Sequence, residues 1–227
     1  MYGLTVENLR CLDGIELIEL PSTGLAGAEG TLASGVSKPK PGEPESPTPL
    51  IFRHRTERVE TARLEFTNLE KPVVIDFINA GDDEGLRKFF DEFGLTIPGS
   101  QVDRDETLRN QKNLRHLLET TNIGSATVAV RTANDIIAQL AGAELLPIWH
   151  QAGRRGAPHV VLKSKSLLAF MLMEVANAAA YGAQLSTCQR CGTAFLTGKM
   201  TMRRTRAKFC SDRCRVAAMR ARQAAGN

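Results

Sequence analysis

CQRCGTAFLTGKMTMRRTRAKFCSDRC, residues 188–214, decides how the carboxyl-terminal part of this chain folds. It contains four of the five cysteines of the sequence, in the spacing C-x2-C-x18-C-x3-C. Two close cysteine pairs separated by a spacer of this length are typical of a tetrahedral zinc site. The sequence therefore predicts that one Zn²⁺ is bound by Cys188, Cys191, Cys210 and Cys214.

The residues around the two pairs predict the elements that carry these ligands. Gly192 frees the backbone directly after the first pair, as a zinc knuckle requires. Ser211 and Asp212 suit the start of a helix, because a serine oxygen accepts from free N–H groups and a carboxylate favours the positive end of the helix dipole. A knuckle, a hairpin and a helix with the last ligand make a treble-clef finger, which we expect at residues 186–227.

Two disulfides are the alternative explanation of the four cysteines. The sequence begins MYGLTVENLRCLDG, which has neither the basic nor the apolar region of a secretory signal peptide. We therefore expect a cytoplasmic, reducing location, where such pairs hold metal. The most apolar segment, residues 167–181, is interrupted by Glu174 and Asn177 and is shorter than the about 20 residues of a membrane span. We expect a buried helix there and no membrane partner.

Positive charge is concentrated in the same carboxyl-terminal part. Residues 187–227 hold ten Lys and Arg against one acid, Asp212, so this segment carries +9 and the remainder −5 of the chain's +4. Such an asymmetry indicates a polyanionic partner. Because there is little aromatic, Asn or Gln content for base readout, we expect contact with the DNA backbone. A solvated, solubilising surface is the alternative. The residues expected to contact phosphates are Arg203, Arg204, Arg206, Lys208, Arg213, Arg215, Arg220 and Arg222.

The rest of the chain divides into three parts. Residues 1–34 give no clear assignment apart from the strand-like GIELIEL, and the Pro-rich residues 35–49 read as an extended linker. Residues 50–185 have the pattern of an α+β domain that is mainly helical with a small β element. The segments expected to be helices are 83–93, 104–120, 125–141 and 166–184, and those expected to be strands are 63–66, 73–78, 145–149 and 159–162.

These parts together resemble the bacterial proteins that join an ABATE-like domain to a CGNR-type zinc finger. The resemblance rests on LEF and VIDFINA, on the helix SLLAFMLMEVANAAAYGAQL, and on CQRCGTAF and KFCSDRCRVAAMRAR. The sequence has Arg215-Val216-Ala217 after the last cysteine, where that family has Gly-Asn-Arg. The resemblance implies a DNA-binding transcription regulator. A shorter match, FCSDRC, is similar to small bacterial zinc proteins that bind DNA gyrase, which implies a protein partner.

The four thiolates also bear on catalysis. They fill a tetrahedral zinc and leave no position for an activated water, so we expect a structural metal and no enzyme. The favoured hypothesis is a zinc-dependent DNA-binding regulator whose 50–185 domain senses a signal or dimerises. The alternative is a protein-interaction zinc module, an adaptor or inhibitor, that docks on an acidic partner or on the helical domain itself. The sequence indicates no oligomeric state.

Overall fold

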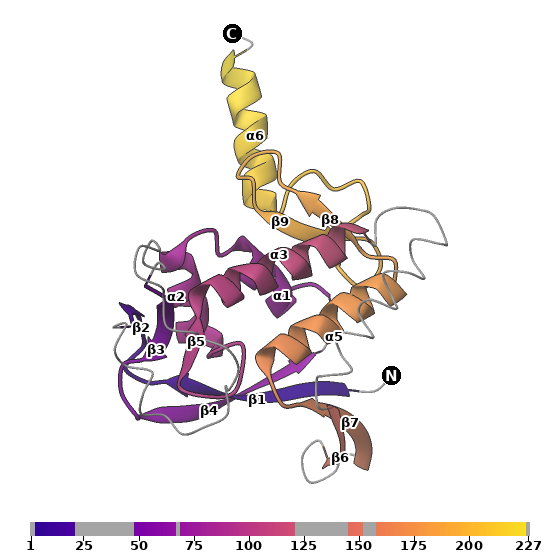
Figure 1. The fold of residues 1–227 in the computed structure, drawn as a ribbon. Coiled ribbons are helices and arrows are strands. Elements are labelled where there is room, and N and C mark those ends of the chain that lie inside the picture. The colour runs from indigo at the N-terminus through magenta and orange to yellow at the C-terminus, as the bar shows by residue number, and fades with distance from the viewer. Residues whose placement is uncertain (1–2, 21–47, 67–68, 121–144, 152–157, 226–227) are drawn as a thin grey trace.

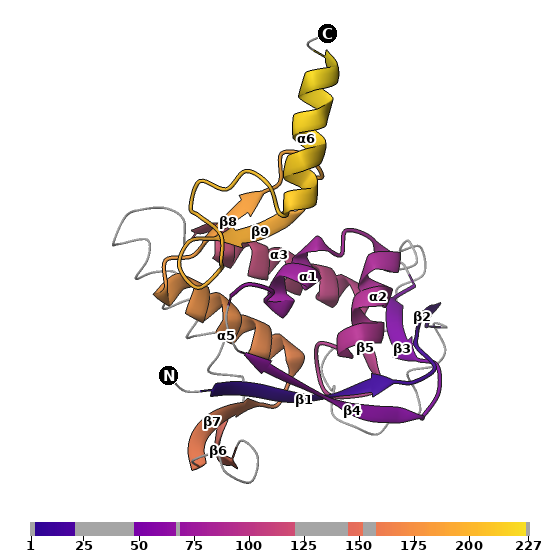
Figure 2. The ribbon, with the colours of Figure 1, turned by 180° about the vertical axis from the view of Figure 1, so that it is seen from behind.

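The computed structural model describes residues 3–20, 48–66, 69–120, 145–151 and 158–225 (Figure 1). These residues form helices and small, largely antiparallel sheets, an α+β fold, as the sequence predicts. The helices lie on one side of a four-stranded sheet, and the cysteine-bearing segment lies beyond them, at the opposite end of the molecule (Figures 1 and 2). None of the helices in the described ranges is long and apolar enough to cross a bilayer.

The four-stranded sheet is organised around the amino-terminal strand. Strand β1 (Gly3–Cys11) pairs antiparallel with β4 (Val59–Phe66) and parallel with β7 (Pro158–Ser164). Strand β6 (Leu145–Gln151) completes the sheet beside β7. The domain that the sequence places at 50–185 therefore also includes residues 3–11, and its β part is larger than expected. Strand β1 pairs with segments about 55 and about 158 positions away, so its place in the sheet depends on contacts that are distant in sequence.

A second, antiparallel sheet lies at one end of the helical layer. Its strands are β2 (Ile15–Glu19), β3 (Leu50–His54) and β5 (Gln101–Asp103), in that order. Strand β2 confirms the strand predicted for GIELIEL. Phe52 of β3 is fully buried, and its ring meets that of Phe90 edge-on with 5.0 Å between centroids. This contact joins the small sheet to the helices.

Three helices follow the capping signals of the sequence closely. Helix α2 (Asp83–Phe93) begins where the Asp82 side chain accepts from the Gly85 N–H. Helix α3 (Arg104–Thr120) has its predicted bounds, and α5 (Leu167–Ala180) begins where Ser166 accepts from the Ala169 N–H. Helix α5 ends four residues before the expected Gln184, because Gly182, at φ +62°, turns the chain into the next strand.

Residues 73–78, predicted as a strand, form the short helix α1 (Val73–Asn79) instead. The β-branched residues indicate extended backbone, but the free N–H groups of Val73 and Val74 donate to the two carboxylate oxygens of Glu174, at 3.0 and 2.8 Å. A side chain from α5 thus caps this helix, where a residue just before the helix usually would. Five of the seven helical residues are buried, so tertiary packing overrides the local preference.

One core holds the helices and the sheets together. It contains Val6 of β1, Phe52 of β3 and the inner faces of α1, α2, α3 and α5. At Gly94, which ends α2 with φ +80°, a Cβ would lie 2.3 Å from the Leu9 carbonyl oxygen, so only glycine allows β1 to approach. Beside it the buried Asn8 donates to the Phe93 and Leu95 carbonyls. These contacts fix α2 against the sheet.

The hairpin that follows α5 belongs to this same core. Strands β8 (Gln184–Thr187) and β9 (Ala194–Thr197) pair antiparallel and lie against α1 and α3 (Figure 1). Ala194 and Leu196 are almost fully buried in the core. The Asn79 side chain donates to the Ala194 carbonyl at 2.9 Å and accepts from the Ala194 N–H at 2.8 Å. The segment predicted as a separate finger at 186–227 is therefore attached to the domain through its first strands.

Replacing Asn79 by Ala should loosen this attachment. The change removes two hydrogen bonds and leaves the Ala194 N–H without its partner, at a cost of about 1–3 kcal/mol in the free energy of unfolding. Urea unfolding of the full chain measures the loss. Asn113→Ala, on the exposed side of α3, is the matched control and should change the stability little. Equal stability of the two variants would contradict the proposed clamp.

The helix predicted at residues 125–141 and most of the linker predicted at 35–49 lie outside the described residues.

Candidate metal centre and basic surface

The four cysteines of the predicted zinc site lie together. Their Sγ atoms are all within 4.8 Å of one another. Cys191 and Cys210 are 3.6 Å apart, Cys210 and Cys214 are 3.6 Å apart, and Cys191 and Cys214 are 3.7 Å apart. A tetrahedral centre with Zn–S bonds of about 2.3 Å has sulfur atoms about 3.8 Å apart. The cluster therefore has the size of a four-thiolate metal site.

A disulfide does not fit these distances. The two sulfur atoms of a disulfide are about 2.05 Å apart, whereas all five cysteines of this chain are free thiols. The fifth, Cys11, is buried in β1 and donates towards the Thr56 carbonyl, far from the cluster. The alternative of two disulfides is therefore not what the structure contains. The cluster can hold a metal ion, and its thiol chemistry favours a soft or borderline ion.

Two elements place the four thiols. Cys188 and Cys191 lie in the tight turn between β8 and β9, where the Gly192 N–H donates to the Cys188 carbonyl and Gly192 has φ +75°. Cys210 and Cys214 flank the start of helix α6 (Asp212–Ala225), where the Cys214 N–H donates to the Ser211 hydroxyl at 3.3 Å. Both local predictions, the knuckle glycine and the serine cap, are confirmed.

The backbone around the cluster favours a thiolate at Cys188. Burial alone would raise the pKa of this thiol, but hydrogen bonds from the backbone N–H groups of Cys210, Cys191 and Arg190 lower the pKa to about 6. The pKa of Cys210 is raised to about 12, first by burial and then by the neighbouring thiols. Several thiols this close cannot all be charged without a cation among them. The cluster is thus electrostatically suited to a divalent metal.

A basic cleft lies beside the metal cluster. It has a volume of about 1470 Å³ and is formed by the loop after β9 together with the first turn of α6. Its acidic lining residues are Glu70 and Asp212. The cations that line it are Lys199, Arg203, Arg204, Arg206, Lys208 and Arg215. The backbone of this loop is unusual in that Met200 and Met202 both have positive φ. The Met200 carbonyl accepts from the Leu69 N–H, which anchors the loop to the rest of the protein.

Three of the predicted phosphate-contacting residues have partners within the protein, and one of these contacts is a long bond of 3.4 Å from the exposed Arg222 to the Ala218 carbonyl of its own helix. Arg203 is half-buried, donates to the Glu70 carbonyl at 3.3 Å and lies over the Phe195 ring at 5.7 Å, so it fixes the loop to the body. Arg215 forms an ion pair with Asp212 at 3.1 Å, with 64% of its side chain exposed. Exposed pairs of this kind contribute little. Arg203 is therefore a structural residue first, and Arg215 remains accessible to an anion.

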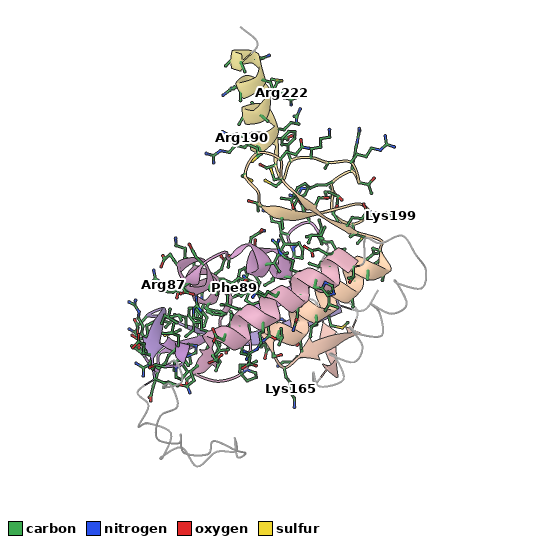
Figure 3. The ribbon with its side chains drawn as sticks, turned by 45° about the horizontal axis from the view of Figure 1, so that its top comes forward. Arg87, Phe89, Lys165, Arg190, Lys199 and Arg222 are labelled. Carbon is green, nitrogen blue, oxygen red and sulfur yellow. The ribbon has the colours of Figure 1, made fainter. Side chains whose placement is uncertain are left out.

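The other predicted cations point to solvent. Arg204, Arg206 and Lys208 are exposed on the loop, and within the described ranges their side chains have no hydrogen bond or ion pair. Helix α6 projects away from the rest of the molecule and buries none of its residues (Figures 1 and 2). Arg213, Arg220 and Arg222 lie on it, all exposed. Figure 3 shows Arg222 on this helix and Arg190 and Lys199 at the same end of the molecule.

No family model matches this chain, and no curated protein or solved structure shows a significant similarity to it. The resemblance to proteins with an ABATE-like domain and a CGNR-type finger stays a prediction. The structure shows an α+β protein in which the last hairpin and the last helix bring four thiols together beside a basic cleft.

Sequence reasoning missed two residues that support this site. Glu174 caps α1 from within the core, and Asn79 at the other end of α1 binds β9. Glu174 carried a signal, because a single acid inside an otherwise apolar helix is expensive to bury unless it is hydrogen-bonded. No signal in the sequence indicated the role of Asn79, since the backbone group that it binds lies 115 positions away.

Proposed function

We propose that this protein is a zinc-dependent DNA-binding protein, a transcription regulator, that contacts the DNA backbone through the basic surface around its metal cluster. A treble-clef finger is the fold we propose for residues 186–227, since the knuckle, the hairpin and the helix with the last ligand occur in that order. The zinc is structural in this proposal, because four thiolates complete its coordination.

The observation that carries the proposal is the cleft with six cations against two acids. A concave surface of one charge concentrates the opposite charge in its solvent, and a phosphate backbone offers a regular row of anions. The exposed Arg204, Arg206 and Lys208 have no partner among the described residues that would compete with phosphate. A bound metal leaves this region positive, since four thiolates and one Zn²⁺ together add about −2 to the +9 that the Lys, Arg and Asp side chains of residues 187–227 carry.

The salt dependence of duplex binding by the full chain tests the proposal. Fluorescence anisotropy with a labelled duplex should give an affinity that falls steeply with salt, by a slope of about −0.9 per neutralised phosphate. Changing Arg204, Arg206 and Lys208 to Gln together should reduce that slope by up to about 2.7 units. The full chain is needed, because Ala194 and Leu196 of the hairpin are buried in the core of the domain.

The matched control changes three exposed cations of α3, Arg109, Lys112 and Arg115, to Gln. It alters the net charge by the same amount and should leave the slope unchanged. If both triple variants behave alike, local phosphate contact is refuted. An acidic protein partner, the rival hypothesis, then becomes the better explanation of the charge.

A further inference from the structure

Helix α6 presents a different kind of residue on each of its sides. Successive helical residues are rotated by about 100°. Arg213 and Arg220 are therefore only about 20° apart and form one column, and Arg215 and Arg222 form another. The two columns lie on opposite sides of the helix, because Arg213 and Arg215 are separated by about 200°. All four guanidiniums belong to exposed residues.

The two remaining sides of α6 differ in their neighbours. Cys214 lies midway between the columns, about 100° from each, and faces the other thiols of the cluster. The side opposite Cys214 carries Val216, Met219 and Gln223, spaced i, i+3, i+7. Met219 is 49% exposed and Gln223 is exposed. Beyond the exposed Asp212 of the first turn, which lies on the same side, an uncharged stripe thus faces away from the metal, with arginines along both of its edges.

The position of the cleft adds a second observation. Arg215 lines the basic cleft, whereas Arg213, on the other side of the helix, does not. One arginine column therefore meets the cleft of Arg204, Arg206 and Lys208 through Arg215, and the other column lies outside the cleft. A single row of phosphates can contact only one of these two arginine columns. Two strands, one on each side of the helix, satisfy both.

The major groove of B-DNA has this arrangement. It is about 12 Å wide and bordered by phosphates on both sides, and a helix with its side chains is about 10–12 Å across. We propose that α6 lies in the major groove, with Arg213 and Arg220 on one phosphate backbone and Arg215, Arg222 and the cleft on the other. Met219 and Gln223 then face the base edges. This proposal rests on the DNA-binding function proposed above and adds a groove and a base-reading face to it.

The chemistry of the stripe defines what it can read. A glutamine amide pairs with both the N6 and N7 positions of adenine, and a methionine side chain packs against the thymine methyl group. Val216 is half-exposed on the same stripe, nearer the metal. The stripe therefore favours sites with A·T pairs at the positions that it meets. The low Asn, Gln and aromatic content predicted contact with the DNA backbone alone, and the free projection of α6 gives the spacing of these three residues a further meaning.

Blocking one groove of the DNA tests the proposal with the zinc-loaded full chain. A duplex in which glucosylated hydroxymethylcytosine replaces cytosine has its major groove filled and its minor groove open. We expect it to bind about tenfold more weakly, or worse, than the unmodified duplex of the same sequence. Netropsin, which fills the minor groove, should leave the affinity unchanged. Equal binding of the two duplexes, or displacement by netropsin, overturns the proposal while leaving DNA binding itself intact. Failure to bind the unmodified duplex overturns both proposals.

Variants of α6 separate the two arginine columns from the stripe. Arg213→Gln with Arg220→Gln, and Arg215→Gln with Arg222→Gln, should each reduce the salt slope by about 1.8 units. Arg109→Gln with Arg115→Gln on α3 is the matched control and should leave the slope unchanged. Met219→Ser with Gln223→Ala should keep the slope but change the sequences selected from a random duplex pool. If this last variant selects the same sequences as the parent, the stripe does not read bases.

Discussion

Removal of the metal should release residues 204–225 while the β8–β9 hairpin and the start of the loop stay folded on the domain. Helix α6 buries none of its residues, so apolar burial does little to order it. The start of the loop is held without the metal, because the Met200 carbonyl accepts from the Leu69 N–H and Arg203 donates to the Glu70 carbonyl. The hairpin is also held, because Ala194 and Leu196 belong to the main core and Asn79 binds the β9 backbone. Zinc binding contributes on the order of 10–16 kcal/mol in small zinc modules. Loss of this binding free energy should therefore unfold the segment that has few other stabilising contacts.

Hydrogen exchange with and without a strong chelator measures this difference. Protection of the α6 amides should disappear in the chelator, and protection of β9 should persist. The metal content of the purified protein should be one Zn²⁺ per chain, and Cys210→Ser should lose it. Cys11→Ser is the matched control, since Cys11 lies outside the cluster and the new hydroxyl keeps the Thr56 carbonyl as a partner. A helix α6 that stays protected without metal would refute the structural role of the ion.

The part of the domain's stability that depends on Glu174 should fall as the pH rises from about 5 to about 8. Burial, opposed by the N–H donors of Val74 and Val73 and reinforced by Asp76, raises the pKa of Glu174 to about 8 from 4.5. Between those two values the folded protein holds a proton that the unfolded chain does not. The stabilisation is therefore fully present below pH 4.5 and is lost as the pH passes through about 8. The total is on the order of 5 kcal/mol, at about 1.4 kcal/mol for each pKa unit.

Glu174→Gln should flatten this pH dependence, because the amide does not titrate. Chemical unfolding at a series of pH values measures the slope of the free energy of unfolding. The slope that remains should be small, because burial raises the pKa of Asp76 and lowers the pKa of His54, and these two shifts contribute to it with opposite signs. Glu119→Gln, on the exposed side of α3, is the control and should keep the full slope. If the parent and Glu174→Gln change in stability by the same amount between pH 5 and pH 8, Glu174 is not buried as described.

Local sequence signals predicted the helices whose ends carry their own caps. Asp82, Ser166 and Ser211 each accept from an N–H three residues later, so the start of each helix is encoded within four residues. Helix α1 begins in another way: its N–H groups donate to Glu174, which lies about 100 positions away. Its β-branched residues then indicate a strand, and only the tertiary contact reverses that preference. The central strand β1 was missed for the same reason, because its partners are distant in sequence.

The thiol cluster and the cations were predictable to different degrees. Cysteine spacing brings four ligands together with few alternatives, so the sequence identifies the cluster directly. An arginine carries no such constraint, and its neighbours decide its role. Arg203 has a carbonyl and an aromatic ring as partners, whereas Arg204, one residue later, is exposed. Only the packed structure distinguishes an anchoring guanidinium from one that is accessible to phosphate.

Helix α1 connects two parts of the molecule that the sequence suggests are independent. It has seven residues and is about 10 Å long. Its first N–H groups donate to the buried side chain of Glu174, and its last residue binds the strand that follows the knuckle. One short helix therefore links the interior of the domain to the segment that carries the four thiols, so a substitution at either end of α1 should be felt by both parts.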